Sequence, residues 1–575
     1  MITYKNNSVI INMSKKKERS LMRNLKRVLG IMLAVMIAMG ALAGCGQKAG
    51  NTTAVEFQYV KDENLNEPGT FPVCKEPITL KIGIPQNSFI TDYENNSFTQ
   101  LLEEKMNCNI EFQMLPTSDT MQKIELMMAS GGDELPDIIC GVNFTDGALS
   151  AYGSSGMIVP MNAYYQNSAY YINDMLEAET DLLDMITSPD GNLYYIPQLV
   201  KAIQNEVGCS RAWINKKWLD KVGLEVPETM DEFKTVLKAF KEQDPNGNGK
   251  PDELPFTGST SLGHLSGLEY LFASFVKFTP RTNYLYVNKD GKVELGFQQD
   301  GWKDAIKYCA DLYKEGLISD STFTLDNNGI TPLRNNPNDA ILGSFVSMSL
   351  SFDSKLADRY DEYVPLPPLE SKNGRAVNVV PSIPNSGFVI TKNCKHPEAA
   401  FRLGDLMIST EMTLSNRFGV KGRDWNYATE DQKSMFSELG YSALVDVVID
   451  TWGVPTNAHW EGKGAGYRSY EITAGQVGSE NNLQETIIAK STQMYLPYAD
   501  TTDVKKFVYN AEDLDSANEI ITNLEAYVKE MTTSFIVGSK DVDKEWDTYL
   551  KQLENMGASQ LIEYTQAAYD RVNEK

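Results

Sequence analysis

The stretch Ile78-Thr79-Leu80-Lys81-Ile82-Gly83-Ile84 decides the fold class of this 575-residue chain. Its apolar, β-branched residues alternate with other residues, which predicts a strand. Helices are expected at 97–106 and 120–129, and further strands at 108–114 and 135–139. Strands that alternate with helices through short connections are typical of βαβ units. The sequence therefore predicts an α/β fold with mainly parallel sheets.

The length of the chain indicates more than one large folding unit. Strands and helices alternate as far as a predicted helix that ends near residue 408, and the remainder has a largely helical pattern. About 500 residues are too many for one small core, so two large lobes are expected. We expect these parts: a signal peptide at 1–44, a tether at 45–75, a first lobe at 76–185 and 338–392, and a second lobe at 186–337 and 393–575 with a helical C-terminal region.

The first 45 residues have the pattern of an export signal. A basic segment at 15–27 precedes an apolar run at 28–41. That run of about 14 residues is too short for a comfortable membrane span. Leu42-Ala43-Gly44-Cys45 follows and resembles the lipobox of bacterial lipoproteins. The resemblance implies cleavage before Cys45 and a lipid anchor on its sulfur; the alternative is an ordinary secretory signal with an incidental cysteine.

A polar loop at Asp244-Pro245-Asn246-Gly247-Asn248-Gly249-Lys250-Pro251-Asp252-Glu253 has the spacing of a cation site. Oxygen-bearing side chains occupy positions 1, 3, 5, 9 and 10, and Gly249 stands at position 6, where such a loop turns sharply. Ca²⁺ takes six to eight oxygen ligands from loops of this spacing. An EF-hand would place an acid at position 12, which is Pro255 here, so Glu253 is the expected substitute. The alternative is a metal-free Asn/Gly/Pro/Asp turn.

Composition and motifs give little support to catalysis or nucleic-acid binding. The chain has 77 acidic and 53 basic residues and a net charge of −24, which disfavours nucleic acid as a partner. Its three histidines, His264, His396 and His459, do not form an H-E-x-x-H motif. The chain has no G-x-S-x-G elbow and no P-loop. The six cysteines after Cys45 are widely scattered, so we expect mostly small buried hydrophobic residues.

Taken together, several motifs resemble the family 1 extracellular solute-binding proteins of ABC importers, in the long lipoprotein subgroup of Gram-positive bacteria. The resemblance covers about residues 75–575. The motifs that carry it are Ala129-Ser130-Gly131-Gly132-Asp133-Glu134-Leu135-Pro136-Asp137-Ile138-Ile139, the turn from Asp190-Gly191 to Pro197, the stretch from Ile214-Asn215-Lys216 to Phe233, Arg417-Phe418-Gly419-Val420-Lys421-Gly422-Arg423-Asp424-Trp425, and Glu545-Trp546-Asp547-Thr548-Tyr549.

This resemblance implies a type II periplasmic-binding-protein fold with two α/β lobes and a ligand in the cleft between them. Hinge closure on the ligand would produce the form that an ABC permease recognises. The family implies a carbohydrate ligand, most naturally an oligosaccharide, and a monomer anchored at the outer face of the cell membrane. The polar loop is similar to the calcium loop of alginate-oligosaccharide-binding proteins. That similarity implies a structural Ca²⁺ with these ligands: Asp244, Asn246, Asn248, the carbonyl of Lys250, Asp252 and Glu253.

Sugar sites combine aromatic faces with amide or carboxylate groups. The aromatic candidates lie near predicted strand ends, where open α/β sheets bind ligands, and are Tyr195, Trp213, Trp302, Trp425, Trp452 and Trp460. Asp137 and Asn215 are the polar candidates. For each aromatic residue the alternative is core packing, and for Asp137 it is capping or turn chemistry.

Three functions therefore remain open. The first is an oligosaccharide-binding protein that serves an importer. The second is the same fold binding a peptide or a signalling solute. The third is a surface polysaccharide-degrading enzyme, because the separation of two catalytic carboxylates is a spatial property that a sequence does not give.

Overall fold

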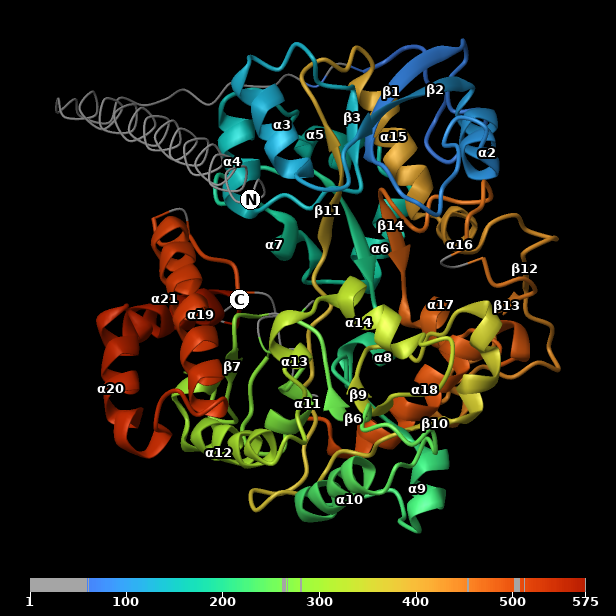
Figure 1. Cartoon of the computed structure of the whole chain (residues 1–575). Helices are drawn as coiled ribbons and strands as arrows, with labels where there is room; N and C mark the ends of the chain where they lie inside the picture. The colour runs from blue at the N-terminus through green and yellow to red at the C-terminus, as the bar shows by residue number, and fades with distance from the viewer. Residues whose placement is uncertain are drawn as a thin grey trace, which may run out of the picture. The chain divides into compact units, whose positions relative to one another are not determined.

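Two β-sheets, one in the upper and one in the lower part of Figure 1, organise the chain. The structure is a computed structural model that describes residues 59, 61–260, 265, 267–279, 282–451, 454–500, 507–510 and 512–573. These residues belong to one unit, Phe57–Lys575. The expected signal peptide, Cys45 and Trp452 lie outside the described residues.

The first sheet has six strands in the order β14-β4-β11-β3-β1-β2. In chain order their bounds are β1 (Ile78–Pro85), β2 (Cys108–Leu115), β3 (Ile138–Cys140), β4 (Ile196–Val200), β11 (Asn385–Ile390) and β14 (Gly466–Arg468). Strand β1 pairs in parallel with β2 and β3, and β14 pairs in parallel with β4. Strand β11 is antiparallel to both of its neighbours.

The second sheet has four strands in the order β10-β5-β9-β6. Their bounds are β5 (Ala212–Asn215), β6 (Leu254–Thr257), β9 (Leu342–Val346) and β10 (Tyr363–Pro365). Only β6 and β9 are parallel; β5 is antiparallel to β9 and β10. The α/β class, the mainly parallel sheets and the helical C-terminal region are confirmed, and a single strand is reversed in each sheet, β11 in the first and β5 in the second.

The mixed pairing has a simple cause in the path of the chain. Strand β5 follows the crossing at 201–211 directly, and β11 follows the crossing at 366–384. A strand that arrives from the other lobe starts at the interlobe side and runs away from it. Strands of a βαβ unit start at the outer side and end at the interlobe side, so the two kinds of strand pair antiparallel.

Helices cover both sheets. In the first lobe they are α2 (Ser97–Met106), α3 (Thr120–Ala129), α4 (Asp146–Ser154), α5 (Asn162–Asn167), α6 (Tyr171–Ala178), α7 (Leu182–Ile186), α15 (Pro397–Ile408) and α16 (Thr410–Phe418). In the second lobe they are α9 (Lys216–Val222), α10 (Met230–Glu242), α11 (Glu269–Phe272), α12 (Asp300–Lys314), α13 (Ser321–Thr324), α14 (Asn327–Arg334) and α18 (Leu483–Tyr495). Each lobe has its own hydrophobic core.

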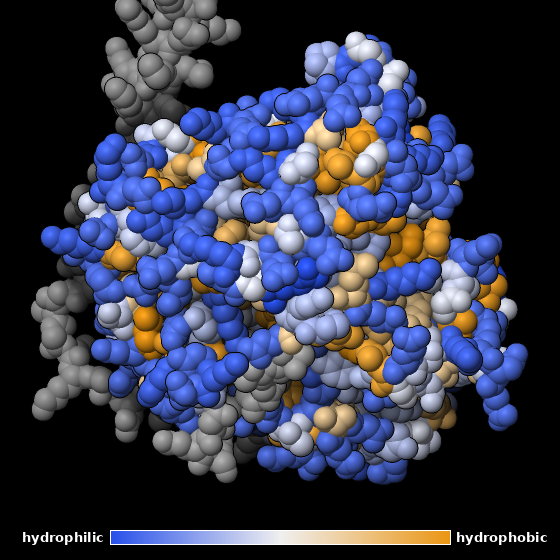
Figure 2. Space-filling view, turned by 90° about the horizontal axis from the view of Figure 1, so that it is seen from below, coloured by the Kyte–Doolittle hydropathy of each residue, from blue (hydrophilic) through white to orange (hydrophobic). Residues whose placement is uncertain are grey.

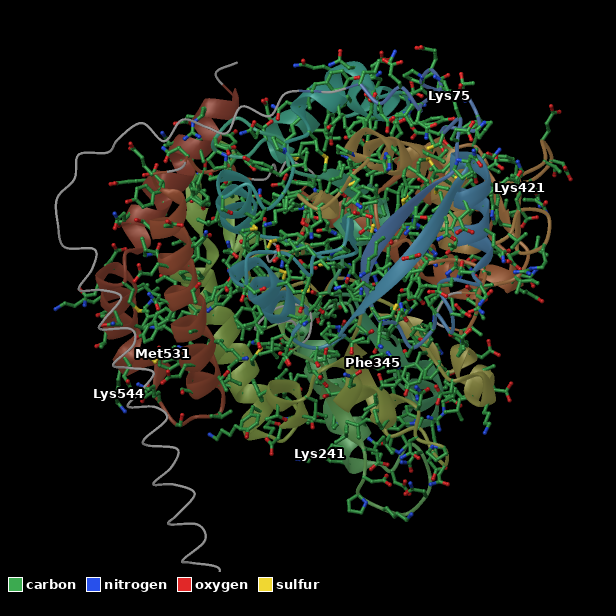
Figure 3. All side chains as sticks on the ribbon, turned by 90° about the horizontal axis from the view of Figure 1, so that it is seen from above. Lys75, Lys241, Phe345, Lys421, Met531 and Lys544 are labelled. Atoms are coloured by element: carbon green, nitrogen blue, oxygen red, sulfur yellow. The ribbon has the colours of Figure 1, made fainter. Side chains whose placement is uncertain are left out.

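Smaller elements complete the fold. Two short hairpins pair β7 (Leu285–Val287) with β8 (Val293–Leu295) and β12 (Trp425–Tyr427) with β13 (Val445–Val447). The C-terminal helices α19 (Leu514–Ile536), α20 (Val542–Asn555) and α21 (Ala558–Asn573) pack on the second lobe. Seen from above in Figure 3, Met531 and Lys544 lie on these helices at one side of the unit, and Lys421 lies at the other.

The expected lobe boundaries are corrected by the strand pairing. Residues 338–392 were expected in the first lobe, but β9 and β10 belong to the second sheet. Residues 393–575 were expected in the second lobe, but β14 pairs with β4, and α15 lies in the core of the first lobe. The chain re-enters the first lobe late because β11 lies in the middle of its sheet, and α15 and α16 follow β11 directly.

The face seen from below in Figure 2 is mainly hydrophilic, with scattered apolar patches. All six described cysteines are buried and free, as expected. Among the described residues, no helix combines the length and the apolar character needed to cross a bilayer.

Three crossings connect the lobes: α8 (Ile203–Glu206) lies in the first, 366–384 forms the second, and α17 (Tyr470–Ala474) lies in the third. Val207 pairs with Val379, and Val377 pairs with Ala499, so the crossing segments support one another. Next to them lies Glu269, which is 2% exposed and accepts a hydrogen bond of 2.8 Å from Ser210. Burial raises the pKa of Glu269 to about 7.

Residues 61–75, which we name the N-terminal strap, are part of the first lobe and not a tether. Val73 and Cys74 donate backbone hydrogen bonds to Lys105 and Met106, and both are buried. Buried Glu398 of α15 accepts hydrogen bonds from Tyr59, the Asp62 backbone and Ser168, at 3.0, 2.6 and 2.7 Å. The tether at 45–75 was therefore predicted too long, because its polar composition hid these contacts with a distant helix.

We expect Glu398→Ala to loosen the strap. The change leaves three donors unsatisfied, and each costs about 1–3 kcal/mol, so the free energy of unfolding should fall by about 3 kcal/mol or more in urea titrations. Limited trypsin digestion should cleave faster at Lys61 and Lys75. Glu67→Ala, at a side chain that is 84% exposed, is the control and should behave like the wild type. If the Glu398→Ala variant resisted trypsin as well as the wild type does, the strap contacts would be contradicted.

Because Glu269 is buried, we expect the stability of the protein to depend on pH. Its pKa is raised from 4.5 to about 7, so the stabilisation given by the protonated acid is complete below pH 4.5 and is lost as the pH rises towards 7. Above pH 7 the wild type should carry a penalty of about 3 kcal/mol relative to Glu269→Gln. Thermal melts of both proteins from pH 5 to pH 8 measure this difference. A difference in melting temperature between the two proteins that does not change with pH would refute this prediction.

Candidate functional site

The polar loop at 244–253 starts where helix α10 ends. A capping box between Thr229 and Glu232 fixes the first turn of α10. Asp244 then takes a left-handed conformation with φ 45°. Gly247 and Gly249 also have positive φ, which glycine adopts without strain, so the chain can fold back tightly around its own side chains.

The first half of the loop arranges side-chain oxygens by local hydrogen bonds. The backbone N–H groups of Gly247 and Gly249 donate to the carboxylate of Asp244, at 2.9 and 3.1 Å. The N–H of Asn248 donates to Oδ1 of Asn246, and the N–H of Lys250 donates to Oδ1 of Asn248. These consecutive turns hold the expected oxygen donors in one short segment.

The acidic half of the loop carries negative charges that are not fully balanced by positive groups within the loop. The amides of Asn246 and Asn248 both donate to Asp252, at 3.0 and 3.2 Å. Glu253 Oε1 is buried and has no hydrogen-bond partner among the described residues. Burial, together with Asp244 and Asp252, raises the pKa of Glu253. A cation in the loop would satisfy this oxygen and offset the like charges.

Asp339 is a further acid at the loop that the spacing of the loop residues did not predict. Asn248 Nδ2 donates to Asp339 Oδ2 at 3.3 Å, across 91 residues of sequence. Within the described residues no group of three or more His, Cys, Asp or Glu side chains is placed to hold a metal by itself. The donor set of this loop instead mixes carboxylates with two Asn amides and a backbone carbonyl, which fits a hard cation.

The second candidate site lies at the interlobe edge, which we define as the ends of β1, β3 and β4 together with the segment 456–464. Carboxyl ends of parallel strands are where open α/β sheets bind ligands. Asn87, just after β1, donates to Glu461, and Gln198 of β4 donates to the Gly462 carbonyl. Asn416 donates to the Lys463 carbonyl at 2.9 Å. The segment is thus tied to several strands and to α16.

Glu461 has a left-handed backbone conformation. Its φ is 53°, which is uncommon for a side chain larger than Asn. Such outliers concentrate at binding sites, where the surrounding structure supports the strain. Next to it, Lys463 crosses the end of β3: a Cβ at Gly141 would lie 3.3 Å from the Cβ of Lys463. Burial lowers the pKa of Lys463.

Two arginines face the same region. Arg417 is buried and lies 3.8 Å from Glu485; burial and then Arg468 lower its pKa to about 9. Arg468 ends β14, and its Nε is buried without a hydrogen-bond partner among the described residues. Burial, followed by Arg417, lowers the pKa of His459 to about 4, so His459 is neutral at pH 7. The edge therefore offers carboxylate, amide and guanidinium groups to a ligand.

A cavity of about 560 Å³ opens beside Asn87 at the ends of β1 and β2. Its wall includes the loop 86–94, Phe112 and Met114, which is 40% exposed. The volume lies within the range of small-molecule sites, about 300–1,000 Å³. The interlobe edge thus combines polar groups with a cavity that has an apolar wall.

Most of the predicted ligand residues lie in cores. Tyr195, Trp213, Trp302, Trp425 and Trp460 are 0–3% exposed. Each of the four indole N–H groups donates within the protein, to Ser347 O, Thr532 Oγ1, Gly419 O and Thr99 Oγ1, respectively. Asn215 is fully buried and caps α9, and Asp137 accepts from the Lys81 backbone. This placement favours packing and capping over ligand contact for these seven residues.

Glu461, Lys463, Arg417 and Arg468 were not among the site residues predicted from the sequence. One signal was available: the glycines of Gly462-Lys463-Gly464-Ala465-Gly466 mark an irregular backbone directly after Trp460. Gly462 and Gly464 do have positive φ. The sequence does not show that these glycines bring the segment against β1, β3 and β4; the tertiary structure does.

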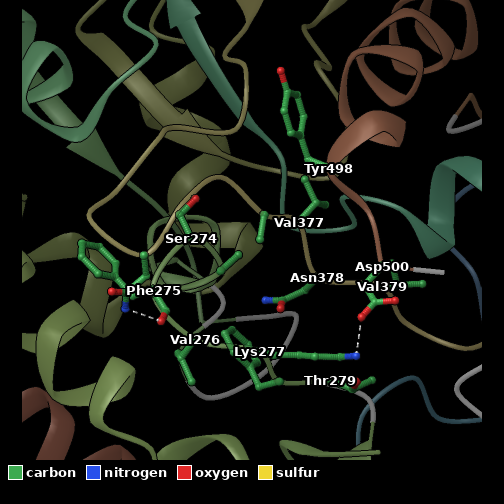
Figure 4. Close-up of a pocket in the computed structure, with 14 residues that line it drawn as sticks. Ser274, Phe275, Val276, Lys277, Thr279, Val377, Asn378, Val379, Tyr498 and Asp500 are labelled. Carbon is green, nitrogen blue, oxygen red and sulfur yellow. Dashed lines mark hydrogen bonds and ion pairs between the residues drawn. The ribbon is translucent and has the colours of Figure 1, made fainter. Parts of the chain in front are cut away.

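A further cavity of about 220 Å³ lies beside the second crossing, as Figure 4 shows. Val377, Asn378 and Val379 form one wall, and Lys277 pairs with Asp500 at 2.7 Å across another side. Because one wall belongs to a crossing segment, movement of the lobes would change the shape of this cavity.

Comparisons with known proteins agree with this architecture. A family model described as bacterial extracellular solute-binding protein matches residues 91–413, more than half of the chain. The chain is 27% identical over 546 residues to the fructooligosaccharide ABC transporter substrate-binding protein FusA of Streptococcus pneumoniae. The alignment covers 93% of this chain and 96% of FusA.

Two solved structures have the same fold. One is an EF-hand mutant of FusA from S. pneumoniae in complex with fructo-nystose, with TM-score 0.67 and 23% identity; it covers 86% of this chain and 99% of the mutant. The other is the alginate-binding protein AlgQ2 without calcium ion, with TM-score 0.63 and 24% identity; it covers 88% of this chain and all of AlgQ2. With its two α/β lobes and three crossings, the chain belongs to the family of bacterial extracellular solute-binding proteins.

Proposed function

We propose that this chain captures an oligosaccharide at the interlobe edge and delivers it to an ABC importer. The observation that carries the proposal is the similarity to the fructooligosaccharide-binding protein FusA over nearly the full length of both chains. The polar groups of the edge match such a ligand, because carboxylates accept hydrogen bonds from sugar hydroxyls and guanidinium groups donate to them.

The mechanism follows from the crossings and the edge. Glu461, held by Asn87, accepts hydrogen bonds from hydroxyl groups of the ligand. Arg468, whose Nε lacks a protein partner among the described residues, donates to a sugar oxygen. The ligand shifts the lobes towards closure only to the extent that it binds the closed form more tightly than the open form. The three crossings carry that movement.

The proposal extends to the location of the protein. We propose that Cys45 is lipidated and holds the protein as a monomer at the outer face of the membrane, where it meets the permease subunits. The structure places the N-terminal strap on the first lobe, so a tether that starts at Cys45 joins that lobe. This arrangement leaves the second lobe free to move relative to the anchored one.

The ligand is tested by titration calorimetry with kestose and longer oligosaccharides. We expect Glu461→Gln and Arg468→Met to weaken binding by about 10- to 100-fold, because each removes a hydrogen bond to a charged group. Glu430→Gln makes the same charge change as Glu461→Gln but at an exposed site, and this variant should bind saccharides like the wild type. Binding of peptides but not of saccharides would overturn the oligosaccharide proposal in favour of a peptide-binding protein. Turnover of the bound saccharide would indicate an enzyme.

We also propose that the loop at 244–253 binds a structural Ca²⁺ through Asp244, Asn246, Asn248, the carbonyl of Lys250, Asp252 and Glu253. The buried, unpaired Oε1 of Glu253 supports the proposal. When bound, the ion would supply the positive charge that the loop lacks. The loop's own residues fix the end of α10 next to β6 and so stabilise the second lobe.

Chelation should therefore lower the melting temperature of the wild type. Calcium at 100 times its Kd contributes about 2.7 kcal/mol of stability, which chelation removes. Asp244→Ala should abolish the sensitivity to chelator, whereas Lys250→Ala should retain it, because only the backbone carbonyl of Lys250 is a proposed ligand. Identical melting of the wild type with and without chelator would exclude a structural metal.

A further inference from the structure

A cavity of about 410 Å³ lies on the first lobe, beside the N-terminal strap. Phe71 of the strap forms one wall, Lys105 of α2 the next, and Tyr171 and Asp174 of α6 another. Thr410 at the start of α16 and Tyr467 of β14 also line it. Segments from the start and the late part of the chain therefore meet around one space.

The strap fixes the wall that Phe71 provides. Arg402 of α15, which is 3% exposed, donates to the carbonyls of Asn66 and Glu67 at 3.3 Å. Asn66 Nδ2 donates to the Pro72 carbonyl at 2.8 Å. Phe71 is nevertheless 40% exposed, although its backbone is held on both sides. A fixed, half-exposed aromatic ring is a preorganised contact surface for a ligand.

The rest of the lining is apolar at Met175, Leu406, Ile408 and Met412 and polar at Lys105, Asp174, Ser409, Thr410 and Glu411. Lys105 Nζ lies 5.1 Å from the centre of the Phe71 ring. Among the described residues, Lys105, Asp174 and Thr410 make no side-chain hydrogen bond or ion pair. Tyr467 is held by a hydrogen bond of 2.9 Å from its hydroxyl to Glu179, so its ring is positioned. The cavity thus has aromatic faces together with carboxylate, ammonium and hydroxyl groups.

This cavity is distinct from the interlobe edge. Lys105 lies in the last turn of α2, just before β2 begins at Cys108. The strap residues Val73 and Cys74 pair with Lys105 and Met106 shortly before β1 begins at Ile78. Both observations place this part of the cavity at the amino ends of β1 and β2. The proposed ligand edge lies at their carboxyl ends.

We infer that this cavity is a second carbohydrate site, which binds one or two sugar rings. The C–H face of a sugar ring packs on aromatic side chains such as Phe71 and Tyr171. Sugar hydroxyls donate to Asp174 and accept from Lys105 and Thr410. An apolar ligand would desolvate the ammonium and carboxylate groups without compensation. The volume suits one or two rings, since ligand sites span about 300–1,000 Å³.

The inference is tested by saturation-transfer NMR and calorimetry on the full mature chain, with kestose and maltotriose as probes. The wild type should show a weak site with a Kd on the order of 1 mM, in addition to any tight site. Phe71→Ala and Asp174→Asn should each weaken the weak site at least fivefold and leave the tight site unchanged. Glu461→Gln should weaken only the tight site, which separates this inference from the proposed function.

Tyr427→Ala is the matched control. Tyr427 is also 40% exposed and also has a lysine over its ring, Lys421 at 4.6 Å, but it lies on β12. This variant should retain both sites. The inference would be overturned if only one class of binding site were detected up to saturating concentrations of kestose and maltotriose. It would also be overturned if both Phe71→Ala and Asp174→Asn left the affinity of the weak site unchanged. So would sugar density at another position in soaked crystals with this cavity empty.

Discussion

The insertion of β11 between β3 and β4 is the constraint on which the rest of the structure depends. β11 arrives from the second lobe and runs antiparallel to both neighbours, so one covalent crossing enters the middle of the first sheet. Its residues Phe388, Val389 and Ile390 are fully buried and join the core of the first lobe. Because the pairing is central, the crossing at 366–384 is anchored firmly at its far end. The second crossing therefore leads from the second lobe directly into a strand that is paired on both edges within the first lobe.

Helix α15, which follows β11, binds the beginning of the chain to the first lobe through buried charges. Glu398, Arg402 and Asp405 are 2–5% exposed. Burial of such groups is expensive unless their hydrogen bonds are satisfied. Arg402 donates to the carbonyls of Asn66 and Glu67, and Asp405 accepts from the backbone of Tyr170 and Ile172. Glu398 accepts from the backbone of Asp62 and from the side chains of Tyr59 and Ser168. The strap is thus recognised through its main chain, which explains why its side-chain composition resembled a linker.

Neighbouring residues of the segment 456–464 have different roles, Trp460 in the core and Glu461 at the interlobe edge. Trp460 is fully buried and packs edge-on against Phe98 and Phe112, at ring distances of 5.1 and 5.5 Å. Its neighbour Glu461 points towards Asn87 at the edge. The tryptophan fixes the segment in the core, and the positive φ of Glu461 turns the carboxylate away from it. Trp460 itself is buried, so the polar residue beside it is the better ligand candidate.

The sequence by itself determined the local elements. Periodicity predicted α2 and α3 and the strands β1, β2 and β3, because the information for these elements lies within a few residues. The loop at 244–253 was also readable, since its donors are close in sequence, whereas Asp339 reaches it from 91 residues away. Only the tertiary structure decided the strand directions, the lobe membership of β9, β10, α15 and β14, and the residues of the interlobe edge. Those depend on contacts between distant segments, whose free energy comes from burial and pairing that no local pattern encodes.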